Sequence, residues 1–398
     1  MQREQVWRDR LHRDVMQLPQ SDPRRESWLN VDRFSSSFVP SWPSQRDACA
    51  PAEFREIFTT YLGAQSPAVR RLAGLTIPCN HGQRTGVIRC DPHGRSLGTA
   101  SLPDGGTYTA CHLAVQRVMY DDARAAGMAG AWEPMADFAA VLPLGRLRQQ
   151  QQQRARTSGL AIIADFWLQC HLCTPSYGRL AAGERGIRGT TERRGAAMRH
   201  SADHRFDVKT IHGGSSSYTA PRARGGDGQC GAVAERAYRV QPEYDRHAAR
   251  QDGLAEVRRH NAGRIDAVQA RLAQLGPIRA LVWGQYAEAS DDVHQLADVV
   301  AREQARREWR LTGARTEAEA LSYYVSRLRR SWGITVAREM ARARLRRVQF
   351  VGQSHDFRPS DRAADGIPVL GGEGDLMPAF GAAGSRARAG GVRAQHAA

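Results

Sequence analysis

The residues with the clearest chemical meaning are an aspartate and a lysine two positions apart, Asp207 and Lys209. Alternate side chains of an extended strand point to one face, so a strand over residues 205–212 would place the two groups side by side. Lys209 is also the one lysine among 57 basic residues, all others being arginine. A lysine that persists in such a sequence suggests a position where a planar, permanently charged guanidinium would not serve. Asp-x-Lys on a strand is typical of metal-dependent phosphodiester cleavage; a simple salt bridge is the alternative.

Two further carboxylates could join this pair. Asp165 lies inside an apolar segment, residues 160–168, where an unpaired carboxylate is costly, and this favours a functional role over that of a strand-end polar residue. Glu133 precedes a proline after a loop, where an exposed surface acid is an equal alternative. Phosphodiester cleavage needs a cation to neutralise the developing charge and acidify a water molecule. We therefore expect Asp165 and Asp207 to bind Mg²⁺ or Mn²⁺, with Lys209 stabilising the transition state and Glu133 as a third carboxylate.

A second kind of metal site is suggested by cysteines and histidines between residues 76 and 107. The candidate ligands are Cys79, His81, Cys90 and His93. Zinc binds four cysteine or histidine ligands in a tetrahedron, so these residues could hold Zn²⁺. The segment contains no C-x₂-C pair, and scattered ligand-type residues in a loop are the alternative.

Composition limits the class of partner. The chain of 398 residues has a formal net charge of +16 and a pI near 10.3. Such a charge favours nucleic acid, with DNA as the first candidate, although biased codon usage also produces arginine-rich surfaces. Apolar runs are too short for a membrane span, the N-terminus does not resemble a secretion signal, and the seven cysteines are scattered. These features predict an intracellular protein, compatible with the nucleus, and leave its oligomeric state open.

The hydrophobic pattern predicts strands that alternate with helices, and hence an α/β core with a mixed central sheet flanked by helices. Helices are expected at 51–62, 109–126, 230–252, 263–275, 291–311 and 334–347, and strands at 160–168, 205–212 and 278–286. The glutamine run at 149–153 suggests a flexible link. The predicted organisation has four parts: a poorly ordered segment 1–50, a helical region 51–130 with the Cys/His loop, an α/β domain 131–352 with a basic insertion at about 174–203, and a disordered tail 353–398.

Several motifs together resemble a known family. Asp165 followed by Asp207-Val-Lys209 is similar to the PD-(D/E)xK nuclease superfamily, with Ala164 in the place of the usual proline. Residues from about 50 to 352 also resemble a nuclease-like region of retroelement-derived proteins from algae and other protists. The matching stretches include Tyr61-Leu-Gly, Cys90-Asp-Pro-His-Gly94, Cys111-His112, Glu133-Pro134, Asp207-Val-Lys-Thr-Ile-His-Gly213 and Ala287-Glu-Ala-Ser-Asp-Asp-Val-His294.

This resemblance implies a restriction-endonuclease-like core, in which residues at the positions of Asp165, Asp207 and Lys209 bind metal and catalyse cleavage. It also implies a Cys/His knuckle, in which Ser96 here replaces an expected histidine. The 41 residues between Asp165 and Asp207 exceed the usual short turn, which indicates an insertion, a retained intron or a misassigned Asp165. The leading hypothesis is a DNA endonuclease. The alternatives are a catalytically decayed nucleic-acid-binding remnant and a fragment with no biochemical role.

Overall fold

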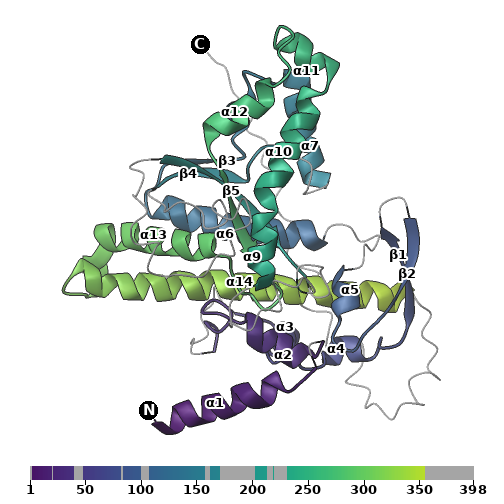
Figure 1. Ribbon diagram of the computed structural model, residues 1–398. Helices are drawn as coiled ribbons and strands as arrows, with labels where there is room; N and C mark the ends of the chain where they lie inside the picture. The colour runs from purple at the N-terminus through teal and green to yellow at the C-terminus, as the bar shows by residue number, and fades with distance from the viewer. Residues whose placement is uncertain are drawn as a thin grey trace, which may run out of the picture.

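The computed structural model describes residues 2–19, 21–39, 48–81, 84–99, 107–156, 162–170, 202–212, 218 and 231–354. Within these ranges the protein is a mixed α/β structure with a four-stranded sheet and a separate two-stranded hairpin (Figure 1). The expected α/β class and mixed sheet are confirmed. The basic insertion at about 174–203 and the tail at 353–398 lie almost entirely outside the described residues. Among the described helices, none combines the length and apolar character that crossing a bilayer requires.

The main sheet has the strand order β3-β4-β5-β6. Its strands are β3 (Gly130–Trp132), β4 (Phe166–Cys170), β5 (Ala202–Thr210) and β6 (Ile278–Trp283). The first three strands pair antiparallel, whereas β5 and β6 pair in parallel. A parallel pair needs a crossover connection, and the part of it that the structure describes after residue 230 contains four helices. They are α9 (Gly231–Tyr238), α10 (Val240–Asp252), α11 (Ala255–His260) and α12 (Ala267–Leu275).

Both faces of the sheet are covered by helices, which explains why β6 is buried along its whole length. Phe206 and Val208 of β5 point into a core that they share with α6 (Thr107–Ala125), α13 (Asp291–Glu308) and α14 (Glu317–Ser354). The opposite face packs against α9, α10 and α12. Because strand side chains alternate, Asp207 and Lys209 belong to this second face. The core that α6 shares with the sheet crosses the domain boundary expected at residue 130.

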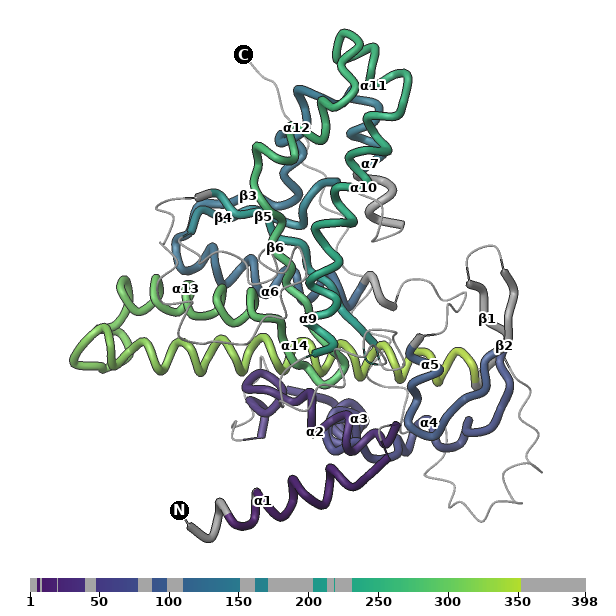
Figure 2. Tube along the Cα trace, in the orientation of Figure 1, coloured from purple at the N-terminus to yellow at the C-terminus, as the bar shows by residue number. Residues whose placement is uncertain are grey.

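Helix α14 is a single helix of 38 residues, where the sequence suggested a break before a helix at 334–347 (Figure 2). Glycine usually weakens a helix interior, yet Gly333 lies in the middle of α14. Close packing explains why the residue is glycine, because a Cβ atom at this position would lie 2.5 Å from the carbonyl oxygen of Phe34. The small residue therefore allows a distant segment to approach the helix closely.

The N-terminal segment differs from the expectation of poor order over residues 1–50. It contains α1 (Gln2–Met16) and α2 (Pro23–Asn30). Phe34 follows them and is fully buried between Trp283 of β6 and Trp332 of α14, with ring centroids 4.9 and 6.3 Å away. The first fifty residues have low average hydrophobicity, so the sequence did not indicate that one aromatic side chain, Phe34, packs this segment against the main core.

Other helices and strands were also compared with their expected positions, and several begin or end at different residues. The helix expected at 51–62 is confirmed as α3 (Pro51–Tyr61), which is followed by α4 (Pro67–Arg70). Residues 76–107 were expected to be loops but include the hairpin β1 (Thr76–His81) and β2 (Arg84–Arg89), and the short helix α5 (Arg95–Thr99). The glutamine run belongs to helix α7 (Leu144–Arg156), and short 3₁₀ turns occupy Met135–Phe138 and Trp309–Thr312. The strand expected at 160–168 begins only at Phe166.

Candidate active site on strands β4 and β5

The main chain at Asp165 lies next to the part of β5 that carries Asp207. Phe166, the first residue of β4, pairs with Phe206 of β5 in antiparallel register, and the amide of Asp165 donates to the carbonyl of Phe206 at 2.8 Å. The Asp165 carboxylate contacts α6, which covers one face of the sheet, whereas the Asp207 carboxylate contacts α10 on the other face. Both side chains are buried, with exposed fractions of 1% and 3%. The 41 intervening residues therefore do not keep these two stretches of main chain apart in the fold.

Asp207 and Lys209 contact each other, as the Asp-x-Lys spacing predicted. The Nζ atom of Lys209 lies 3.0 Å from Oδ1 and 2.9 Å from Oδ2 of Asp207. Tyr244 of α10 donates a second hydrogen bond to Oδ1 at 3.1 Å. The carboxylate is thus held between a cation on its own strand and a phenol from the covering helix. The sequence identified the lysine but not Tyr244, whose contact depends on a helix 37 residues away.

Asp165 is contacted by two side chains of α6. The Nε2 atom of His112 lies 3.4 Å from Oδ1 of Asp165, and Gln116 donates its amide to the Asp165 carbonyl at 3.0 Å. The other carboxylate oxygen accepts the backbone N–H of Val208. The sequence pointed to His112 only as part of a motif. Its spacing of four residues from Gln116 places both on one face of the helix, a signal that could have been used.

Glu133, the expected third carboxylate, is joined to Asp165 through the main chain. Its N–H donates to the carbonyl of Asp165 at 2.9 Å, and its backbone adopts a φ of 42°, which is unusual for a residue other than glycine. This turn places the end of β3 beside the start of β4. The connection gives Glu133 a structural part in positioning Asp165.

Within the described ranges, no group of three or more cysteine, histidine, aspartate and glutamate side chains is arranged to hold a metal ion. Mg²⁺ commonly takes only one or two protein carboxylates and completes its shell with water and substrate phosphates.

The structure describes the side chains of only some of the residues predicted to bind zinc. Cys79 and His81 belong to β1, but their side chains are outside the described part of the protein. Cys90 is 3% exposed and packs in an apolar cluster with Leu72 and Val348. Burial raises the pKa of the Cys90 thiol to about 11, which disfavours the thiolate that binds zinc.

The turn that follows Cys90 is organised by Asp91. Its Oδ1 atom accepts the N–H of His93 at 2.9 Å. Its Oδ2 atom accepts both the N–H and the hydroxyl of Ser96, at 2.7 and 2.8 Å. These hydrogen bonds lower the pKa of the Asp91 carboxyl despite its burial. Ser96, which replaces the histidine expected from the family pattern, thus closes the turn through a carboxylate.

Several arginines of α14 bind neighbouring parts of the protein. Arg342 contacts Glu53 at 2.6 Å, and Arg344 contacts Glu56 at 2.7 Å, so both bind α3. Arg347 is 2% exposed and donates to the carbonyl of Leu97. Three of these charges therefore stabilise packing around α14.

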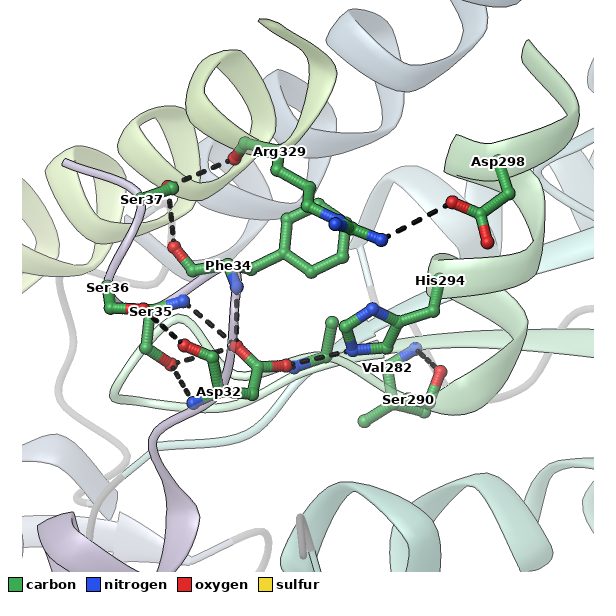
Figure 3. A network of polar contacts seen from close by, with 11 residues as sticks. Asp32, Phe34, Ser35, Ser36, Ser37, Val282, Ser290, His294, Asp298 and Arg329 are labelled. Atoms are coloured by element: carbon green, nitrogen blue, oxygen red, sulfur yellow. Dashed lines mark hydrogen bonds and ion pairs between the residues drawn. The ribbon is translucent and has the colours of Figure 1, made fainter. Parts of the chain in front are cut away.

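A second polar network surrounds Asp32 (Figure 3). Oδ1 of Asp32 accepts the N–H groups of Phe34 and Ser35 at 2.8 and 2.9 Å. Oδ2 accepts the N–H of Ala289 at 2.9 Å and lies 3.0 Å from Nε2 of His294 on α13. The network fixes the N-terminal segment to the loop between β6 and α13. His294 is thus part of a structural polar contact.

The same loop contains a fully buried carboxyl group, Glu288. The hydroxyl of Tyr218 donates to it, and the N–H of Tyr286 donates to Oε2 at 2.9 Å. Burial raises the pKa of Glu288 to about 8, so the group is mostly protonated at neutral pH. The sequence showed only the motif that contains this residue.

Comparisons with models of protein families, with curated proteins and with solved structures found no match for this chain.

Proposed function

We propose that this protein is a metal-dependent endonuclease of restriction-endonuclease-like fold, derived from a retroelement, which hydrolyses DNA phosphodiester bonds. The observation that carries the proposal is the ion pair of Lys209 with Asp207 on β5, next to the residue whose carbonyl accepts the N–H of Asp165. The mixed sheet with helices on both faces agrees with the resemblance to PD-(D/E)xK nucleases, as does the order Asp, then Asp-x-Lys, on successive strands.

Each side chain has a defined task in this proposal. Asp165 and Asp207 would hold Mg²⁺ or Mn²⁺, which when bound neutralises charge on the phosphate and acidifies a water molecule. The water oxygen would form the new bond to phosphorus and lose a proton to solvent, while the bond to the leaving oxygen breaks and that oxygen takes up a proton from solvent to become an alcohol. Lys209 stabilises the negative charge that develops on the phosphate. Tyr244 and His112 keep the two carboxylates in place through their contacts of 3.1 and 3.4 Å.

Charge supports nucleic acid as the substrate class. A net charge of +16 attracts a polyanion at long range, and DNA supplies the phosphodiester that this site would cleave. The arginines of α14 that bind α3 reduce the number of cations free for that task, so the binding surface must use others.

The test is nicking of supercoiled plasmid with Mg²⁺ or Mn²⁺, comparing the wild type with Asp207→Asn and Lys209→Ala. We expect each substitution to reduce nicking by at least about 100-fold, since each removes a group that acts on the phosphate. Asp266→Asn is the matched control, because its carboxylate pairs with Arg264 on an exposed surface. Nicking that remains undiminished in both site variants would disprove the proposal.

A second candidate function is a catalytically decayed nucleic-acid-binding protein. The net charge of +16 would attract nucleic acid equally well without catalysis. In that case the wild type binds DNA in a gel-shift assay but shows no nicking with either cation. Retained binding in Asp207→Asn, together with an inactive wild type, would favour this function over cleavage.

A further inference from the structure

The loop that connects β6 with α13 is attached to the N-terminal segment by two carboxylates. Glu26 of α2 accepts hydrogen bonds from the side-chain amide of Gln285 and from the hydroxyl of Tyr286, both at 3.0 Å. Asp32, shown in Figure 3, accepts the N–H of Ala289 at 2.9 Å. The N-terminal segment therefore lies along this loop and is bound to it at two separate points.

A third carboxyl group, Glu288, lies in the same loop and is fully buried. The hydroxyl of Tyr218 donates a hydrogen bond to one of its oxygens. The N–H of Tyr286 donates to the other oxygen at 2.9 Å. The group is thus enclosed by the loop itself and by one tyrosine from outside it.

The three carboxyl groups differ in their access to a cation. Glu26 forms an ion pair with Arg95 of α5, and Asp32 lies 3.0 Å from Nε2 of His294. In the part of the chain that the structure describes, no basic side chain forms an ion pair with Glu288. A buried carboxylate without a cation is costly, so Glu288 favours its neutral form. Burial raises the pKa of Glu288 to about 8, and the negative charge of Asp32 adds to this shift.

The loop is also held in a strained conformation. The N–H of Gly284 donates to the carbonyl of Glu288 at 2.9 Å, which closes the loop on itself. Ala287 has a φ of 58°, in the left-handed region that is unfavourable for a residue with a Cβ atom. Such a backbone persists only where surrounding contacts fix it, and the N-terminal segment supplies several of those contacts. Detachment of the segment would therefore release strain in the loop.

We propose that the proton on Glu288 controls attachment of the N-terminal segment, residues 22–38: the neutral carboxyl group allows docking, and its ionisation detaches the segment. The ionised group would bring a third negative charge to the interface that contains Glu26 and Asp32, and detachment returns this charge to water. Docking raises the pKa of Glu288 from 4.5 to about 8. The contribution of this group to docking is therefore complete below pH 4.5 and is lost as the pH rises through about 8. This regulation is independent of the proposed nuclease function.

The test is hydrogen exchange of the full-length protein between about pH 6 and about pH 9, followed by mass spectrometry and corrected for the intrinsic exchange rate of each amide. The N–H groups of Phe34 and Ser35, which donate to Asp32 at 2.8 and 2.9 Å, report on docking. Helix α13 reports on unfolding of the whole protein. We expect protection of the segment to fall about tenfold or more over this range, because detachment releases a proton. Its protection should also stay below that of α13 throughout.

Three variants connect this effect to Glu288. Glu288→Gln keeps the shape of the neutral carboxyl group and cannot ionise, so protection of the segment should become independent of pH. Glu243→Gln is the matched control, because this carboxylate of α10 pairs with Arg236 at 2.9 Å and its loss should leave the pH dependence of the wild type unchanged. Tyr218→Phe removes a hydrogen bond that lowers the pKa of Glu288, so it should move the loss of protection to higher pH.

Three results would overturn the inference. The first is protection of the segment that does not change with pH in the wild type. The second is equal protection of the segment and of α13 at every pH, because the segment would then open only when the whole protein unfolds. The third is an unchanged pH dependence in Glu288→Gln, which would assign the effect to another group such as His294. If Glu288→Gln does not fold, Tyr218→Phe decides, since an unchanged pH dependence in that variant would contradict the role of Glu288. These measurements use no nucleic acid, so their outcome leaves the nuclease proposal untouched.

Discussion

The phenol of Tyr244 and the carboxylate of Asp207 meet between α10 and β5, with the hydroxyl donating to Oδ1 over 3.1 Å. The same hydroxyl lies 3.4 Å from the carbonyl of Ile163, two residues before Asp165. One buried side chain therefore connects the two strands that carry the candidate acids. A helix in the crossover between β5 and β6 thus helps to fix the site.

Tyr244→Phe should lower the free energy of unfolding by about 1 kcal/mol, because it removes a buried hydrogen bond to a charged acceptor and keeps the ring. Urea denaturation followed by circular dichroism measures this change. Tyr323→Phe is the control, since Tyr323 is 55% exposed and should show no loss. Equal midpoints for Tyr244→Phe and the wild type would mean that the contact does not stabilise the fold.

Phe34→Ala should cost about 3–5 kcal/mol, as expected for removal of a fully buried aromatic side chain. A lower melting temperature in differential scanning calorimetry is the expected readout. Phe54→Ala removes a ring that is 53% exposed and should change stability by less than about 1 kcal/mol. A similar small change in both variants would show that the N-terminal segment is not part of the cooperative unit.

Asp292→Ala should also lower the free energy of unfolding strongly. Asp292 and Arg279 form an ion pair at 2.9 Å, with both side chains 1% exposed. Removal of one partner leaves a buried charge uncompensated, at a cost of about 3–5 kcal/mol. Asp298→Ala, which removes a half-exposed carboxylate paired with Arg329, should cost about 1 kcal/mol or less. The double variant Arg279→Met/Asp292→Leu should recover much of the lost stability, and failure to do so would argue against charge burial as the cause.

Glu288 predicts a pH dependence of stability. Its pKa is raised from 4.5 to about 8 in the folded protein, so between these values the native state binds more protons than the unfolded state. The free energy of unfolding should therefore fall as the pH rises from about 4.5 to 8, with a slope of at most ~1.4 kcal/mol per pH unit from this group. Denaturation at several pH values should show a flatter profile for Glu288→Gln. The same slope in variant and wild type would contradict the prediction.

The sequence predicted the elements whose hydrophobic pattern is strong and local. Helices α3 and α13 and strands β5 and β6 lie near their expected positions, because their periodicity reflects burial on one or both faces. The continuity of α14 was missed, since Gly333 signals a break unless the backbone of Phe34 is known to pack against it. That contact joins residues about 300 positions apart, and no local pattern contains it.

In the candidate site, too, the contacts that depend on local spacing could be predicted, and those that depend on tertiary packing could not. The contact between Lys209 and Asp207 followed from a spacing of two residues on one strand. The placement of Asp165 required the register of β4 against β5, and its contacts with His112 and Gln116 required the packing of α6 on the sheet. These are tertiary relationships. The sequence was sufficient to predict which residue types could take part in the chemistry. The side chains that contact them could be identified only from the fold.

Helix α14 is the last described element of the chain, yet it packs against α3, α6 and α13. During synthesis the earlier helices leave the ribosome before the surface that covers them exists. Their apolar faces must stay exposed, or be shielded by chaperones, until residues 317–354 have emerged. Completion of the core, and with it the final placement of α6 against Asp165, therefore waits until residues 317–354 have left the ribosome.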